Sequence, residues 1–319
     1  MRKFFSSFSS TFLKMTKKIK IGVIGGSGLY NLDHMKFIEE IHPETPWGYP
    51  SSKVIIVEDP KGFRIAFLTR HGIGHKYNPS EVPSRANIAA LKHIGVEIII
   101  AFSAVGSLQE EIKCRDFVIP DQIIDRTKGI RPSTFFEGGA AAHVTFADPF
   151  NSLLADLIYS NRKCIEEPEN DGQSRPRLTV HRNKTLVCME GPAFSTRAES
   201  KLYRSWNCDV INMSVLPEAK LAKEVEIAYQ MICMSTDYDC WKQDEEVVSV
   251  ENVLTNLNQN VENAKKLLAE ILPDLEQALN DGKFDNLKGV MKKSCITNSN
   301  IMNEETIKKL NYILPGYFE

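Results

Sequence analysis

Two carboxylates, Asp237 and Asp239, stand one residue apart directly after an apolar, strand-like run that ends near Met234. If extended backbone geometry continues past Met234, side chains two residues apart project to the same face, so both carboxylates would line one pocket wall. Two neighbouring carboxyl groups repel each other when both are ionised. We therefore expect one of them to have a raised pKa and to donate a proton, while the other accepts hydrogen bonds. Such a pair can recognise the edge of a purine. The alternative is a turn, in which Asp237 caps the next helix and Asp239 is solvated.

A glycine-rich turn near the N-terminus is a second candidate for chemistry. Residues 20–24 predict a short buried strand, and the sequence Gly-Gly-Ser-Gly follows at 25–28. Glycines let backbone N–H groups approach an anion closely, and Ser27 adds a hydroxyl donor. The glycine spacing departs from the dinucleotide-binding fingerprint, and the lysine of a Walker loop is missing. The turn therefore favours a phosphate or nucleoside-phosphate site over a nicotinamide site, with a purely structural turn as the alternative.

Polar residues follow two further predicted strands. The strand at 64–69 leads into Arg70 and His71, and the strand at 96–102 leads into Ser103. An arginine binds phosphate through two parallel hydrogen bonds, and a neighbouring histidine can donate to the same anion or relay a proton. In open parallel sheets, ligands bind outside the carboxyl ends of the strands, so these side chains and Ser27 could converge on one anion. An isolated Arg-His pair on the surface is the alternative.

The elements that would position these residues indicate one α/β domain. The chain has 319 residues and a mass of 36.0 kDa, and 42% of its residues are hydrophobic, enough for a large core. Strands alternate with helical segments, and apolar residues recur at helical spacing over 253–271, where Pro273 is expected to close the helix. A net charge of −2 without a long basic run argues against nucleic acid as a partner. We expect no membrane span, because no apolar stretch is long enough.

The remaining segments carry weaker signals. Seven cysteines show neither metal-ligand spacing nor a disulfide framework, so we expect reduced, mostly buried thiols and a cytoplasmic protein, with the nucleus as a second location.

Residues 1–18 lack acidic residues and are interpreted as a loose tail; a mitochondrial targeting segment and a start at Met15 are the alternatives. We interpret residues 19–290 as the catalytic domain, 166–177 as an exposed loop, and 291–319 as a C-terminal segment with helical character near a subunit interface.

Several motifs together resemble a known family. They are IGVIGGSGL, LTRHGIGHKYNPSEVPSRANIAAL, AVGSLQEEI, DQIIDRT with RPSTFF, EGPAFSTRAE, DVINMSVLPEAKLAKE and TDYDCWK. Over residues 20–268 the chain resembles the 5′-methylthioadenosine phosphorylases, a branch of the trimeric purine nucleoside phosphorylases. The resemblance implies a single α/β domain with a mixed central sheet flanked by helices, assembled as a homotrimer. Three positions differ, because Ser27, Ser103 and Ser214 stand where the family usually has threonine; we expect activity to survive these changes.

The resemblance also implies roles for individual positions. The phosphate site would consist of Ser27, Arg70, His71, Ser103, Ala104 and Ser214. The nucleoside would contact Phe194, Ser195, Met213, Asp237, Asp239, Val250, Val253 and His143. In this arrangement Asp237 and Asp239 are the catalytic carboxylates at the base edge, Val250 and Val253 surround the 5′-methylthio group, and His143 reaches into the site of a neighbouring subunit.

The activity implied by the resemblance is cleavage of S-methyl-5′-thioadenosine by phosphate, which releases adenine and 5-methylthioribose 1-phosphate; adenosine is a further candidate substrate. Phosphate would be a co-substrate, and neither a metal nor an organic cofactor is expected. A purine nucleoside phosphorylase for inosine and guanosine is the alternative enzyme, although Asp237 suits the 6-amino group of adenine better than an oxo group. The third hypothesis is a nucleoside-binding protein without catalytic activity.

Overall fold

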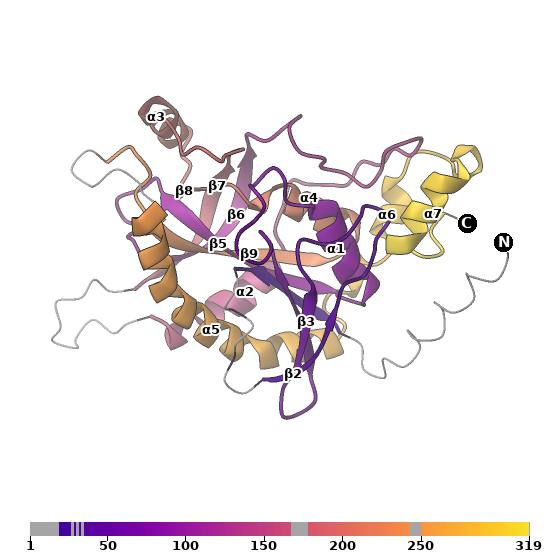
Figure 1. Ribbon diagram of the computed structural model, residues 1–319, viewed down its shortest axis with the longest axis horizontal. Helices are drawn as coiled ribbons and strands as arrows, with labels where there is room; N and C mark the ends of the chain where they lie inside the picture. Colours follow the sequence, from indigo (N-terminus) through magenta and orange to yellow (C-terminus); the bar gives the residue numbers. More distant parts are fainter. Residues whose placement is uncertain are drawn as a thin grey trace.

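The computed structural model describes residues 19–26, 29, 32, 35–166, 178–242 and 250–318, with the backbone alone for residues 250 and 252 (Figure 1). The predicted tail at 1–18 and Ser27 lie outside these residues, and so does the predicted loop beyond its first residue.

Nine strands form one mixed sheet within the described residues. They are β1 (Ile21–Gly25), β2 (Lys36–Ile41), β3 (Val54–Glu58), β4 (Arg64–Thr69), β5 (Ile98–Ser107), β6 (Phe117–Asp125), β7 (Val180–Cys188), β8 (Val210–Asn212) and β9 (Ala228–Asp237). Their order is β2-β3-β4-β1-β5-β8-β7-β6-β9, and β9 also pairs with β5. The last five strands therefore close into a ring, from which β1 to β4 extend as an open arm. Strands β4, β1, β5 and β9 are mutually parallel neighbours, so their carboxyl ends lie at one edge.

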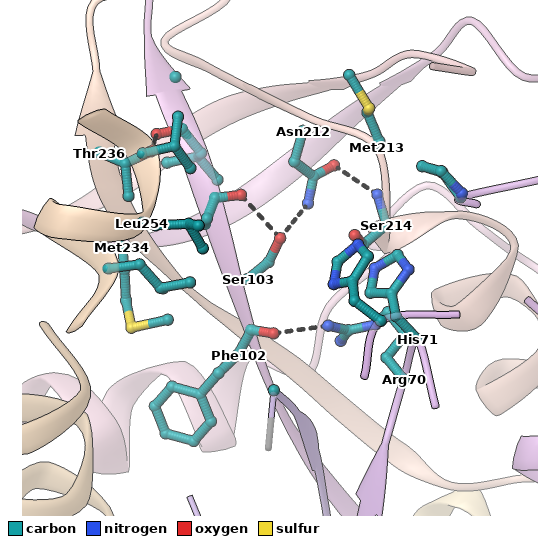
Figure 2. Close-up of a pocket in the computed structure, with 18 of the residues that line it drawn as sticks. Arg70, His71, Phe102, Ser103, Asn212, Met213, Ser214, Met234, Thr236 and Leu254 are labelled. Atoms are coloured by element: carbon teal, nitrogen blue, oxygen red, sulfur yellow. Dashed lines mark hydrogen bonds between the residues drawn. The ribbon is translucent and has the colours of Figure 1, made fainter. Parts of the chain in front are cut away.

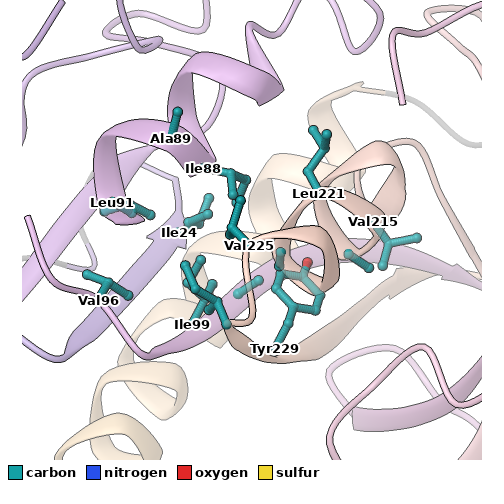
Figure 3. Close-up of a cluster of buried hydrophobic side chains, with 14 of the residues drawn as sticks. Ile24, Ile88, Ala89, Leu91, Val96, Ile99, Val215, Leu221, Val225 and Tyr229 are labelled. Atoms are coloured by element: carbon teal, nitrogen blue, oxygen red, sulfur yellow. The ribbon is translucent and has the colours of Figure 1, made fainter. Parts of the chain in front are cut away.

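Helices cover the sheet on both faces because the strands are apolar on both faces. The helices are α1 (Ser84–His93), α2 (Ser152–Ser160), α3 (Arg197–Ser205), α4 (Val215–Glu224), α5 (Val250–Asn280), α6 (Val290–Ser294) and α7 (Glu304–Ile313). One face packs against α1 and α4, where Ile24, Ile88 and Leu221 meet (Figure 3). The opposite face, including Ile21 and Val23 of β1, packs against α2 and α5. This alternation along one strand is the pattern of a strand buried on both sides.

The observed elements match the predicted ones where the signal is local. The strand predicted at 64–69 is β4 without change, and β1 is shifted by one residue. The prediction that Pro273 closes the long helix was wrong, because α5 continues through it to Asn280. A proline inside a helix removes one backbone hydrogen bond. Beyond it, Leu275, Ala278 and Leu279 are buried against the sheet, and that burial favours continuing the helix.

The C-terminal segment packs on the domain. Met291, Met302 and Leu310 are buried in the same cluster as α1 and α4. Backbone hydrogen bonds join this segment to the stretch around His143, whose amide donates to the Ser294 carbonyl at 2.9 Å. All seven cysteines are free; Cys188, Cys208 and Cys233 are buried, fewer than predicted. No helix in the described part of the chain has the length and apolar character needed to cross a membrane.

Candidate active site

A cavity of about 500 Å³ lies at the carboxyl ends of β1, β4, β5 and β9. Figure 2 shows its two sides: Arg70, His71 and Ser214 gather at one, and Met234, Thr236 and Leu254 at the other. The described residues that line it include Gly26, Arg70, His71, Ser103, Ala104, Phe194, Ser195, Met213, Ser214, Asp237, Asp239 and Val253. The parallel strands thus bring together side chains from distant parts of the sequence.

Arg70 is held rigidly at the polar side of the cavity. Its Nε and Nη2 donate to the two carboxylate oxygens of Glu218 at 2.8 and 2.9 Å, and its Nη1 donates to the Phe102 carbonyl at 2.7 Å. Tyr229 donates its hydroxyl to Glu218 at 2.7 Å. Burial alone would lower the pKa of Arg70, but Glu218 outweighs it and the pKa is raised. These bonds use three of the five guanidinium N–H groups, so two can donate to an anion.

His71 is neutral at neutral pH in this structure. Its Nδ1 lies 2.9 Å from the Tyr77 carbonyl, and its ring stacks on His75 with centroids 4.2 Å apart. Burial lowers its pKa to about 4, outweighing the bond to the Tyr77 carbonyl, and the charge of Arg70 adds to the decrease. Because a carbonyl only accepts, Nδ1 carries the proton and Nε2 is an acceptor. In this protonation state the free ring nitrogen of His71 does not donate to an anion, which was one of the two roles considered for this residue.

The side-chain amide of Asn212 links Ser103 and Ser214, which both line the cavity. Asn212, at the end of β8, donates its Nδ2 to Ser103 Oγ at 3.1 Å and accepts from the Ser214 amide at 3.4 Å (Figure 2). Ser214 directly precedes α4, whose first turn is interrupted by extended backbone at Leu216, with φ of −116° and ψ of 139°. Asn212 thereby ties β5 to the start of α4 and sets the separation of the two serines.

Asp237 ends β9 in an enclosed position. Its Oδ2 accepts from the Thr236 hydroxyl at 2.8 Å, and its Oδ1 accepts from the Asp239 amide at 2.8 Å. Gly106 on β5 lies beside it, and a Cβ at Gly106 would stand 2.9 Å from Oδ1. Burial raises the pKa of Asp237 to about 6, against the lowering effect of these two hydrogen bonds. A carboxyl with this pKa is partly protonated near neutral pH and can act as a general acid.

Asp239 lines the same wall, but through a turn. The strand ends at Asp237, and Asp239 has a left-handed backbone with φ of 49°, so the expected continuation of extended geometry was wrong. Burial also raises the pKa of Asp239, with Ser200 and Ser195 opposing that increase. Repulsion by Asp239 raises the pKa of Asp237 less than burial does, so the increase comes chiefly from burial rather than from the pairing of like charges. The Oδ2 atom of Asp239 is buried without a hydrogen-bond partner among the described residues.

The N-terminal part of α5 forms the apolar wall opposite the polar side. Val253, Leu254 and Leu257 line the cavity. The helix is fixed to β9 by two amides: Asn256 donates to the Thr236 carbonyl at 2.6 Å, and Asn260 to the Ser235 carbonyl at 3.2 Å. These carbonyls directly precede Asp237, so the apolar wall and the acidic group are held in one unit.

Most of the predicted site residues that the structure describes are brought together, with one exception. His143 is exposed and is not among the described residues that line the cavity. Ser27 and the side chain of Val250 lie outside the described residues. Sequence reasoning missed Glu218, Asn212 and Leu257. Leu257 belongs to the apolar stripe predicted for the helix, but that stripe was interpreted as core, whereas no spacing connects Glu218 with Arg70, 148 residues away.

No group of three histidine, cysteine or carboxylate side chains suited to a metal ion occurs among the described residues.

The fold and the site define a nucleoside phosphorylase class of protein, and the sequence comparison agrees: residues 20–273 match the phosphorylase superfamily model, so the chain belongs to the phosphorylase superfamily. It is 53% identical over 305 residues to the S-methyl-5′-thioadenosine phosphorylase of Yarrowia lipolytica, covering 95% of this chain and 94% of that one.

Two solved structures are similar throughout. A methylthioadenosine phosphorylase from an antarctic soil metagenomic library superposes with a TM-score of 0.81 at 41% identity, covering 94% of this chain and 100% of that one. The methylthioadenosine phosphorylase of Schistosoma mansoni, in complex with adenine, gives a TM-score of 0.79 at 33% identity, covering 87% and 99%. The resemblance inferred from the motifs, and the single α/β domain with a mixed sheet, are thereby confirmed.

Proposed function

We propose that this chain cleaves S-methyl-5′-thioadenosine with phosphate, releasing adenine and 5-methylthioribose 1-phosphate. One observation carries the proposal. A buried arginine and two hydroxyls line one side of the cavity, and a buried carboxyl with a pKa of about 6 lines the other. The activity of the relatives supports the same reaction. A small nucleoside as ligand is supported by a solved structure of a mutant of the S. mansoni adenosine/methylthioadenosine phosphorylase in complex with methylthioadenosine.

The phosphate end would work by charge and position. Arg70 has two N–H groups to offer, and Ser103 and Ser214 add hydroxyls from β5 and the start of α4. A phosphate held there would lie beside the sugar, whose C1′ gains positive charge as the glycosidic bond breaks. Because Glu218 and Phe102 already orient the guanidinium, little reorganisation is needed when phosphate binds. Phosphate is a co-substrate, and we propose no metal or organic cofactor.

The base end would work by proton donation and by matching hydrogen bonds. Asp237 in its protonated form donates to the purine nitrogen that gains negative charge as adenine leaves. Asp239 lines the same wall, and a carboxylate oxygen of its buried side chain would accept from the 6-amino group of adenine. An oxopurine offers no donor at that position, so inosine would leave this buried oxygen without a hydrogen bond and should react poorly.

An adenine-release assay tests the proposal. Purified enzyme is incubated with methylthioadenosine, adenosine or inosine, each with and without phosphate, and the free base is quantified by chromatography. We expect release of adenine from methylthioadenosine only when phosphate is present. Phosphate-independent release would indicate a hydrolase, and faster release of hypoxanthine from inosine would indicate the 6-oxopurine enzyme.

The 5′ substituent can be tested separately at Val253. Val253→Thr keeps the shape of the side chain but places a hydroxyl in the apolar wall, so kcat/KM for methylthioadenosine should fall about tenfold. Adenosine, whose 5′ hydroxyl can pair with the new one, should lose less. Val290→Thr on α6 is the matched control outside the cavity. An equal loss for both nucleosides would mean that Val253 supports the fold instead of recognising the 5′ group.

We further propose a cytoplasmic homotrimer in which His143 completes the site of a neighbouring subunit. The exposed position of His143, on a stretch joined to the C-terminal segment, suits an intermolecular role. Light scattering coupled to size-exclusion chromatography would measure the assembled mass. His143→Ala should raise KM for the nucleoside in a trimer, whereas a monomeric, fully active enzyme would contradict this assembly.

A further inference from the structure

Arg131 is a buried arginine outside the cavity lining, on the loop that follows β6, and only 6% of its surface is exposed. All five of its N–H groups are used. Nη1 donates to the carbonyls of Met213 and Leu216 at 2.8 and 2.5 Å. Nη2 donates to the carbonyls of Met189 and Glu190 at 3.3 and 2.7 Å.

The fifth donor, Nε, reaches the Ser80 hydroxyl at 3.2 Å, and Ser80 in turn donates to the Glu190 carbonyl at 3.3 Å. Arg131 therefore joins three segments: the loop at 79–80, the end of β7, and the turn between β8 and α4. The carbonyls replace water as the partners of the buried charge. A guanidinium can do this because its donors are spread in a rigid plane, whereas a lysine ammonium acts from one point.

These three segments also meet through packing. A Cβ at Gly191 would stand 2.4 Å from Met213 Sδ and 3.3 Å from Pro79 Cγ, so the Met213 side chain lies directly on the backbone after Glu190. Met213 and Ser214 both line the cavity. The Met189 amide donates to the Asn212 carbonyl at 2.9 Å, and Arg131 adds its bonds to the Met213 and Leu216 carbonyls beyond that point.

We propose that Arg131 is a positioning residue for the sugar and phosphate side of the active site. By holding the Met213 and Leu216 carbonyls against the end of β7, it fixes the Ser214 hydroxyl and the Met213 side chain where phosphate and ribose must meet. The two carboxylates of the base side are held by other elements, because Asp237 and Asp239 belong to β9 and to the turn that follows it. The inference rests on the proposed phosphorolysis and adds a residue that contacts neither reactant.

Arg131→Lys tests the proposal, because it keeps a charge while losing the spread of donors. Displacing a reacting or binding group by about 1 Å can cost about a hundredfold in rate, so we expect kcat/KM for phosphate to fall between about tenfold and about a hundredfold. The dissociation constant for adenine alone, measured by calorimetry, should stay within about twofold. Arg64→Lys is the matched control, because Arg64 pairs with Glu58 at the start of β4, away from the cavity.

The possible results distinguish a positioning role of Arg131 from a general structural role. A parallel loss of adenine binding would indicate a general structural role and overturn the proposal, and so would unchanged phosphate kinetics. If Arg131→Lys does not fold, Ser80→Ala decides. This substitution at an exposed residue removes the contact to Arg131 Nε and the bond to the Glu190 carbonyl, and it should raise KM for phosphate while leaving adenine binding unchanged. Unaltered phosphate KM in Ser80→Ala would then contradict the inference. A wild-type enzyme without phosphorolysis would refute the proposed function instead, and it would be recognised before any variant is compared.

Discussion

Asp237→Asn should lower kcat for phosphorolysis of methylthioadenosine by about a hundredfold to ten-thousandfold, because an amide cannot donate the acidic proton that the leaving adenine requires. The substitution preserves size, and the Asn oxygen can still accept from the Asp239 amide. Steady-state kinetics with saturating phosphate measures the effect. Asp156→Asn, an exposed aspartate on α2, is the matched control. Near-normal turnover by Asp237→Asn would refute the assignment of this residue as the general acid.

The same group should set the pH dependence. The folded pKa of Asp237 is raised to about 6, so the free enzyme carries the proton below that pH and loses it above. At constant phosphate-dianion concentration, kcat/KM should therefore fall above pH 6, by about tenfold per pH unit in the limit. The falling limb should be missing in Asp237→Asn.

Stability provides an independent check on this variant. Because burial raises the folded pKa of Asp237 above its ordinary value of 3.8, the stability that protonated Asp237 contributes is fully present below pH 3.8 and is lost as the pH rises through about 6. Asparagine does not ionise and avoids this loss. The melting temperature of Asp237→Asn at pH 8 should therefore be no lower than that of the wild type, and a large decrease would mean that the activity was lost through unfolding.

Arg70→Ala should weaken phosphate binding much more than nucleoside binding. Loss of two charge-assisted hydrogen bonds should raise KM for phosphate by about a hundredfold or more, while the base side is untouched. The single variant Arg70→Ala has a second effect, because it leaves Glu218 buried without its partner. An uncompensated buried charge costs about 3–5 kcal/mol of stability, which would obscure the kinetics.

A double variant separates the two effects. In Arg70→Met with Glu218→Gln no buried charge remains, and the amide oxygen at 218 can still accept from the Tyr229 hydroxyl. We expect the double variant to recover most of the melting temperature lost by Arg70→Ala, yet to keep the high KM for phosphate. The assignment fails if the KM for the nucleoside rises while that for phosphate stays constant.

Local sequence was sufficient for the strands whose signal lies within a few residues. The runs that form β1 and β4 are short, apolar and bounded by polar or glycine residues, so their positions were predicted to within one residue. The strand β5 was predicted to end before Ser103, yet it runs to Ser107. Its last residues include two serines, an alanine and a glycine, and they are extended because they pair with β8 and β9. Pairing of that kind depends on segments far away in the chain, so no local pattern could indicate it.

The sequence by itself determined which chemistry is available: an arginine and hydroxyls after strands, and two carboxylates after a third strand. Only the tertiary structure decided how these groups behave. The turn at Asp239, where φ is 49°, arises where β9 ends, and burial rather than charge repulsion is the main cause of the raised pKa of Asp237. The orientation of Arg70 depends on Glu218, 148 residues distant, because a buried charge requires a partner and only the fold brings one within 3 Å.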